Sequence, residues 1–307
     1  MFEAIPFGPF IFWTHLAFIL LGIWLSAEFF FRLAQSAGLS LHTFKEKGLL
    51  YLIAFLLIGR AFTVLENFRL YTKDWTRVFI LSDGNFSFLG AAAGIAIILY
   101  MNARQSRTTF LQWLDVLLPA ATFGLVFDWL GKFAAGQSFG SPTDMPWGVT
   151  YDTYTVSYTI PVHPVQLYYA LFYFVLTFLL LIVRRHSKRA GAETLFGIVV
   201  AALGTMFFEL FRGDPATPVF ASLADLLVLC GLFGSLTGVA LLEHKLRPNL
   251  IMAYEIGATL LVGSYFFFRQ ALDLATYQLR FSQFLAVLAL LTVVVYVVVH
   301  RQRHPHL

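Results

Sequence analysis

The sequence predicts an all-α polytopic membrane protein with about nine transmembrane helices. The chain has 307 residues, of which 59% are hydrophobic and only 12% are charged. Apolar segments recur along it, and each approaches the roughly 20 residues that a helix needs to cross a bilayer. They cover residues 10–31, 49–67, 86–103, 110–130, 164–184, 192–211, 217–242, 249–268 and 281–300.

Basic residues in the loops predict the orientation of the chain. Thirteen Lys and Arg residues fall on one side of the membrane and seven on the other, while Arg60 lies inside the second segment. Because cytoplasmic loops are enriched in Lys and Arg, the N-terminus is expected outside and the C-terminal tail inside. The longest loops, 68–85 and 131–163, then face outward. A functional site is therefore expected at the outer membrane boundary.

Composition argues against several other functions. The net charge of +4 comes from basic residues in short loops, which indicates membrane topology rather than nucleic-acid binding. The single cysteine, Cys230, lies in an apolar segment, so neither an intramolecular disulfide nor a cysteine metal site is predicted. No cofactor and no metal ion is predicted. No basic region precedes the first apolar segment, which is therefore expected to be a retained span rather than a signal peptide.

A polar stretch stands where the long loop 131–163 meets the next apolar segment. Its residues 161–169 read Pro-Val-His-Pro-Val-Gln-Leu-Tyr-Tyr. His163 can titrate near neutral pH, and Gln166 and Tyr168 bring hydrogen-bonding groups to a bilayer that offers none. The stretch is either a binding site or a helix cap with interfacial tyrosines, and both interpretations stay open.

Other polar residues also fall in or near the apolar segments. Arg60 is either a structural cation or a cation that faces an anionic ligand, because a lone charge in a bilayer is costly. Glu209 and Arg212, three residues apart, form an intrahelical ion pair or else orient a phosphate and a proton acceptor. Asp128 and Lys132 are four apart, and snorkelling of the lysine is the simpler explanation.

Several of these stretches, taken in order, resemble the bacterial phosphatidylglycerol:prolipoprotein diacylglyceryl transferases. The resemblance covers about residues 5–245. It implies a seven-helix core over 1–245, followed at 246–307 by two additional helices and a basic cytoplasmic tail. The matching stretches are Phe7-Gly8-Pro9, Leu57-Ile58-Gly59-Arg60, Asp83-Gly84, Ser87-Phe88-Leu89-Gly90, Leu130-Gly131-Lys132-Phe133, His163-Pro164-Val165-Gln166-Leu167-Tyr168 and Glu209-Leu210-Phe211-Arg212.

The chain departs from the family's motifs at charged positions. Leu89 stands where the family has a histidine, and Trp129 and Thr205 stand where it has arginines. Lys132 replaces an asparagine and Gln137 replaces a glutamate. None of the first three residues can ionise.

The resemblance implies transfer of a diacylglyceryl group from phosphatidylglycerol to an acceptor thiol in the bacterial cytoplasmic (inner) membrane. This chemistry needs a base to form the thiolate and cations to hold the departing glycerol phosphate. The candidates for substrate binding are Arg60, Lys132, Gln166, Tyr168 and Arg212, and the candidates for the base are His163 and Glu209.

The alternative is a catalytically degenerate homologue that binds lipid or serves as a subunit of a membrane complex. The replaced residues Leu89, Trp129 and Thr205 favour it, whereas Lys132 supplies a new cation one turn from a lost arginine. The expected partners are accordingly a membrane phospholipid, above all phosphatidylglycerol, and either a lipoprotein precursor or another membrane protein.

Overall fold

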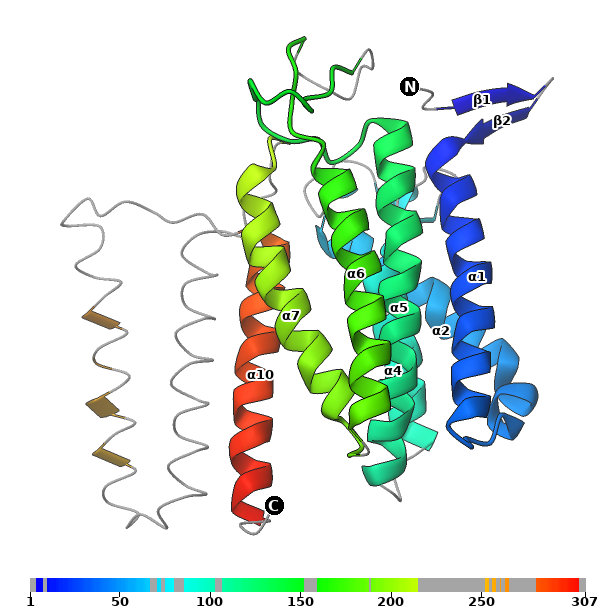
Figure 1. Ribbon diagram of the computed structural model, residues 1–307, viewed down its shortest axis with the longest axis vertical. Coiled ribbons are helices and arrows are strands. Elements are labelled where there is room, and N and C mark those ends of the chain that lie inside the picture. The colour runs from blue at the N-terminus through cyan, green and yellow to red at the C-terminus, as the bar shows by residue number, and fades with distance from the viewer. Residues whose placement is uncertain are drawn as a thin grey trace. The chain divides into compact units, whose positions relative to one another are not determined.

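The computed structural model describes most of the chain as helices (Figure 1). The described residues are 4–7, 10–66, 71–72, 75–79, 86–102, 107–151, 159–187, 189–214 and 280–303, with seven helical residues between 252 and 264. The chain divides into two units. The first comprises Met1–Val200 and Leu210–Pro215, and the second comprises Ala201–Glu209 and Ala216–Leu307.

Seven of the nine predicted segments correspond to described helices. Five of the described helices are long and apolar enough to cross a bilayer, which agrees with the predicted all-α membrane protein. Predicted segment 217–242 lies outside the described residues, and segment 249–268 is described at only seven positions. The helices are α1 (Thr14–Ser36), α2 (His42–Glu66), α4 (Phe88–Asn102), α5 (Arg107–Ala135), α6 (Val165–His186), α7 (Ala192–Phe208) and α10 (Phe281–Arg303).

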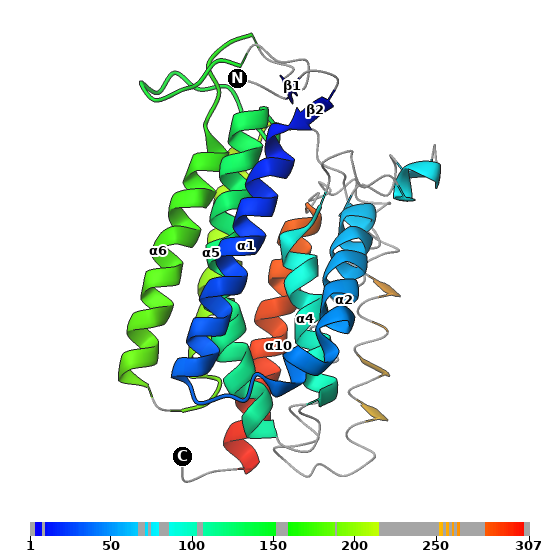
Figure 2. The same ribbon diagram turned by 90° about the vertical axis from the view of Figure 1, so that its right-hand side faces the viewer.

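Helix α5 is the centre of the first unit. It packs against α1, α4 and α6, and α2 packs against α4 (Figures 1 and 2). Glycines permit these contacts: a Cβ at Gly124 would meet the Phe88 ring, and one at Gly94 would lie 2.7 Å from the Ala54 carbonyl oxygen. Small residues thus bring the helices together where hydrocarbon solvent gives apolar side chains little reason to associate.

The N-terminal residues differ from the prediction. Strand β1 (Ala4–Phe7) pairs antiparallel with β2 (Phe10–Trp13), and α1 begins only at Thr14. The predicted start of the first span at residue 10 is therefore wrong. Pro6 and Pro9 each remove a backbone donor, and the aromatic and β-branched residues around them favour strand over helix.

Helix α5 is longer than the predicted segment 110–130. It runs through Pro119 without ending and reaches Ala135, so that Lys132 lies in its last turn. The residues after it form the loop to α6. We call this end of the helices, which also carries the β1–β2 hairpin, the loop end (Figure 1).

Candidate functional site

Backbone bridges organise the loop between α5 and α6. Val149 and Val162 exchange two backbone hydrogen bonds of 3.0 Å each. The His163 nitrogen donates to the Ser141 carbonyl oxygen at 3.0 Å, and Gly140 pairs with Arg212 in an isolated bridge. The loop therefore holds His163 beside the segment that follows α7.

His163 and Tyr168 face each other at the start of α6. His163 Nδ1 lies 3.2 Å from the Tyr168 hydroxyl, and Trp147 Nε1 donates to that hydroxyl at 2.7 Å. Because the indole only donates, the Tyr168 oxygen accepts from it and can donate its own proton to Nδ1. The Phe211 ring lies 5.3 Å from the His163 ring and closes one side of the pair.

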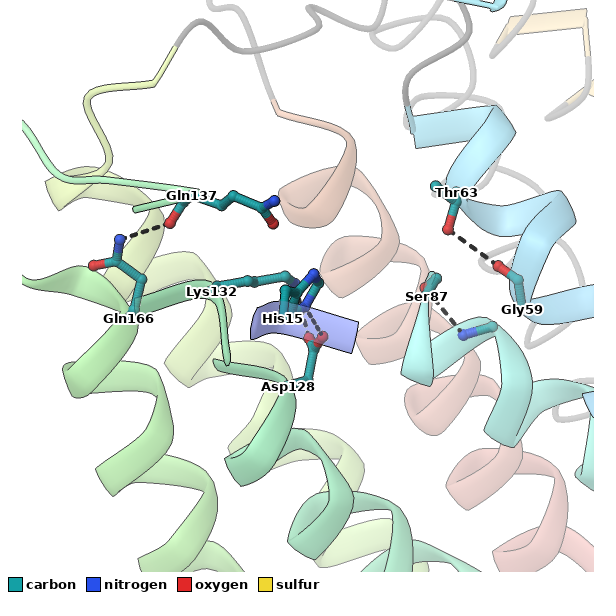
Figure 3. A network of polar contacts seen from close by, with 9 residues as sticks. His15, Gly59, Thr63, Ser87, Asp128, Lys132, Gln137 and Gln166 are labelled. Carbon is teal, nitrogen blue, oxygen red and sulfur yellow. Dashed lines mark hydrogen bonds and ion pairs between the residues drawn. The ribbon is translucent and has the colours of Figure 1, made fainter. Parts of the chain in front are cut away.

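Gln166 is fully buried at the start of α6. Its Nε2 donates to the Gln137 carbonyl oxygen at 2.6 Å (Figure 3). Its Oε1 accepts from the Tyr151 hydroxyl at 3.2 Å. Burial raises the pKa of Tyr151, which lies in the loop, to about 12. Gln166 thus ties the loop end of α6 to the residue that follows α5.

A buried network of three ionisable side chains joins α1 to α5. His15 Nε2 lies 3.0 Å from Asp128 Oδ1, and Lys132 Nζ donates to Asp128 Oδ2 at 2.8 Å (Figure 3). His15 and Asp128 are each 3% exposed, and the lysine side chain is 23% exposed. Snorkelling is therefore the wrong explanation for the Asp128/Lys132 pair, because the lysine turns toward a buried carboxylate.

The two ring nitrogens of His15 have different surroundings. Because an ionised carboxylate only accepts, Nε2 donates to Asp128, and Nδ1 is the ring nitrogen left without that bond. Within the part of the chain that the structure describes, this buried Nδ1 has no hydrogen-bond partner. A buried polar atom without a partner is uncommon and calls for a catalytic or ligand-binding explanation.

Local sequence explains why α1 and α5 approach so closely here. A Cβ at Gly131 would lie 2.9 Å from His15 Cδ2 and 2.7 Å from Phe18 Cβ. On the α6 side, Trp129 stacks on Tyr169 with ring centroids 4.1 Å apart, and Lys132 Nζ lies 4.5 Å from the Trp129 ring. The tryptophan at the family's arginine position thus supplies an aromatic face to the lysine.

Arg60 and Arg212 come from different parts of the first unit. Arg60 is buried in α2, where Nε donates to the Val78 carbonyl oxygen at 3.1 Å and the guanidinium lies 5.2 Å from the Tyr71 ring. Arg212 binds Asp214 through two hydrogen bonds of 2.9 and 2.6 Å. The paired arrangement resembles the bidentate geometry with which arginine holds phosphate.

The other positions singled out by the sequence lie in α4, in α7 and directly after α7. Glu209 belongs to the second unit, where its buried carboxylate lies 3.5 Å from Arg280 Nε. Thr205 lies in α7 within the same unit. Leu89, at the family's histidine position, is 49% exposed in α4.

The sequence singles out Lys132 and the 161–169 stretch as candidates but gives no sign of His15. The network brings together residues 113 positions apart, and a histidine beside Thr14 carries no motif of its own. Two local signals mark this part of α5: Asp128 and Lys132 are four residues apart, and Gly131 lies between them. Neither signal identifies α1 as the helix that packs there.

Apolar helices long enough to cross a bilayer, with buried ionisable side chains near one end, define an α-helical integral membrane protein with a polar site inside its bundle. A family model described as prolipoprotein diacylglyceryl transferase matches residues 3–242. The chain belongs to this family.

Individual relatives support the same family. The chain is similar to the phosphatidylglycerol–prolipoprotein diacylglyceryl transferase of Clostridium tetani, with 33% identity over 44% of this chain and 56% of that protein. The enzymes of the same name from Finegoldia magna and Thermotoga maritima are 26% and 27% identical, over 68% and 75% of this chain and 82% and 81% of theirs. The chain thus spans about half of the first relative and about four fifths of the other two.

Proposed function

We propose that the protein transfers a diacylglyceryl group from phosphatidylglycerol to the cysteine thiol of a lipoprotein precursor. Family membership supports this activity, and so do the activities for which the relatives are named. The observation that carries the proposal is the buried His15–Asp128–Lys132 network near the loop end. Ionisable groups inside a membrane protein are costly and mark functional sites by default.

The reaction needs a proton acceptor and a stabilised leaving group. A carbon–sulfur bond forms as the thiol attacks the diacylglyceryl carbon, and the bond from that carbon to the phosphate oxygen breaks. The thiol proton goes to a base, and glycerol phosphate leaves with the electron pair. A positioned base typically contributes about 10²–10⁴-fold to such a step.

His15 is the base that the contacts favour. Asp128 holds the Nε2 proton, so the lone pair of Nδ1 is left for the thiol proton and the resulting imidazolium is stabilised by the carboxylate. This role compensates for the loss of the family's histidine at Leu89. His163 and Glu209 remain the alternative bases that the sequence predicts.

The substrate contacts follow the sequence analysis. Arg60, Lys132 and Arg212 hold the phosphate, and Gln166 and Tyr168 complete the substrate-binding residues. In support, the Gln166 side chain already bonds the loop backbone, and Tyr168 bonds His163.

For the whole chain we propose nine spans with the N-terminus outside and the C-terminus cytoplasmic. Residues 1–245 form the family core, and 246–307 add two helices.

The test is transfer from labelled phosphatidylglycerol to a peptide with a lipoprotein acceptor cysteine, by the purified full-length protein. The key variant is His15→Gln, whose amide can still donate to Asp128 but cannot take a proton. Its turnover should fall by about a hundredfold or more while its melting temperature is kept. Matched variants His163→Gln and Glu209→Gln show whether either alternative base is used.

Two results distinguish a wrong choice of base from a wrong proposed function. Full activity in His15→Gln would remove His15 from the base role without touching the transferase activity. Absence of transfer by a folded wild-type protein that binds phosphatidylglycerol would instead contradict the proposed function. It would favour the degenerate lipid-binding homologue, which the family matches do not support.

A further inference from the structure

A polar cavity lies at the opposite end of the helices from the loop end. Its volume is about 400 Å³. Its lining comes from the last residues of α1 and α6, the first turn of α7 and the N-terminal part of α5. Because several helices end around it, the cavity lies at the level of phospholipid head groups if the bundle spans a bilayer.

One of the two acids that line the cavity is fully engaged. The Asp115 carboxylate accepts from the Gly191 nitrogen at 2.6 Å, and from the Thr194 nitrogen and hydroxyl at 2.9 and 2.6 Å. These bonds hold the turn before α7 and the first turn of that helix. Asp115, which the sequence alone leaves undecided, therefore has a structural role and is not the group that meets a ligand.

The other acid, Glu193, has an oxygen that no donor from the described residues meets. The residue is 3% exposed and lines the cavity. Its Oε2 lies 3.8 Å from Arg184 Nη1, whereas Oε1 has no hydrogen-bond partner among the described residues. A buried carboxylate oxygen is costly to leave without a donor, so a ligand that carries N–H groups would satisfy it.

Two arginines line the same cavity. Arg184 is partly engaged, because Nη2 donates to the Leu33 carbonyl oxygen at 3.3 Å and Nη1 contacts Glu193. Arg189 is exposed, and no hydrogen bond or ion pair of its side chain is found within the described part of the chain. The cavity thus offers guanidinium groups to an anion and a carboxylate oxygen to a cationic donor.

We infer that this cavity binds the head group of a zwitterionic phospholipid with a primary amine, that is, a phosphoethanolamine group. Its phosphate meets Arg184 and Arg189, and its ammonium donates to Glu193 Oε1. A phosphocholine group has no N–H to give, and a phosphoglycerol group carries no cation. The site is separate from the His15–Asp128–Lys132 network and takes a different lipid from the proposed substrate.

The experiment compares short-chain phosphatidylethanolamine, phosphatidylcholine and phosphatidylglycerol for binding to the delipidated full-length protein by native mass spectrometry. Free phosphoethanolamine and inorganic phosphate form two further arms, which distinguish a lipid from a soluble source of the same group. We expect the ethanolamine lipid to bind at least about tenfold more tightly than the other two. Glu193→Gln should bring this preference to below about threefold.

Arg189→Gln supplies a second variant, because an exposed side chain can be changed without loss of the fold. It should weaken the ethanolamine lipid, while the matched control Arg185→Gln, also exposed on this end but not lining the cavity, should not. Equal binding of the three lipids, or a preference kept in both Glu193→Gln and Arg189→Gln, would overturn the inference. So would binding of inorganic phosphate as tight as that of phosphoethanolamine.

Discussion

His15 Nε2 lies 3.0 Å from Asp128 Oδ1, and both residues are almost fully buried. The bond joins the first turn of α1 to the final third of α5. It supplies an imidazole that a carboxylate already orients.

Replacement of Asp128 by Asn should harm both stability and transfer. The amide removes the charge that Lys132 and His15 share, so the free energy of unfolding should fall by about 1–3 kcal/mol and turnover by about a hundredfold or more. Denaturation in detergent and the transfer assay measure the two effects. The matched control is Glu46→Gln, whose exposed pair with His42 at 3.4 Å should contribute less than about 1 kcal/mol.

Lys132 should be needed for its charge. Lys132→Met keeps most of the side chain's volume but loses the cation, so kcat/KM for phosphatidylglycerol should fall by about tenfold to a thousandfold. Lys132→Arg should keep more activity, because it retains the positive charge. If the methionine variant were as active as wild type, the phosphate role of Lys132 would be wrong.

A histidine restored at position 89 should not replace His15. Leu89 is half-exposed on α4, so Leu89→His would carry its imidazole on a lipid-accessible surface. The double variant His15→Gln/Leu89→His should therefore be as inactive as His15→Gln alone. Recovery of transfer in the double variant would place the reacting thiol on the α4 side instead.

Raising the pH above about 10 should lower the free energy of unfolding through Tyr151, which lies in the loop between α5 and α6. Burial raises the pKa of this phenol to about 12 in the folded chain, against about 10 in the unfolded chain. Between these values the folded state holds a proton that the unfolded state has lost, so the free energy of unfolding falls as pH rises from about 10 to about 12. Below a pH of about 10 the phenol is protonated in both states, so the stability associated with protonated Tyr151 is fully present.

Thermal melts across this range check the prediction. Tyr151→Phe removes the titrating group and its bond to Gln166, so it should be less stable than wild type near neutral pH and lose less stability above pH of about 10. Parallel losses in the two proteins would assign the alkaline effect to other groups.

Structural features that depend on residues close together in the chain could be predicted from the sequence, whereas contacts between distant residues could not. Helix positions follow from local apolar runs, which is why α6 at Val165–His186 lies within two residues of the predicted 164–184. The hairpin before α1 depends on pairing between residues, and a hydropathy window cannot detect it. The His163/Tyr168 contact joins residues five apart in one stretch that the sequence singles out, whereas the His15/Asp128 bond depends on how two helices pack.

The replacements at the family's positions also needed the structure. Trp129 reads in sequence only as a lost arginine, yet its ring stacks on Tyr169 and lies beneath the Lys132 ammonium. Such compensation involves a second helix and a side chain one turn away. A comparison with the family at one position at a time records only the lost arginine and not this compensation.

Pro119 lies between the two polar regions of α5. It has no N–H, so the Asp115 carbonyl oxygen four residues earlier lacks its normal helical partner, and Arg184 Nη1 lies 3.5 Å from that oxygen. A side chain from α6 therefore stands in for a missing backbone bond in the central helix. Asp115 lies on one side of this proline in α5 and Asp128 on the other. The guanidinium that lines the cavity therefore also serves a backbone acceptor of the helix that carries Asp128.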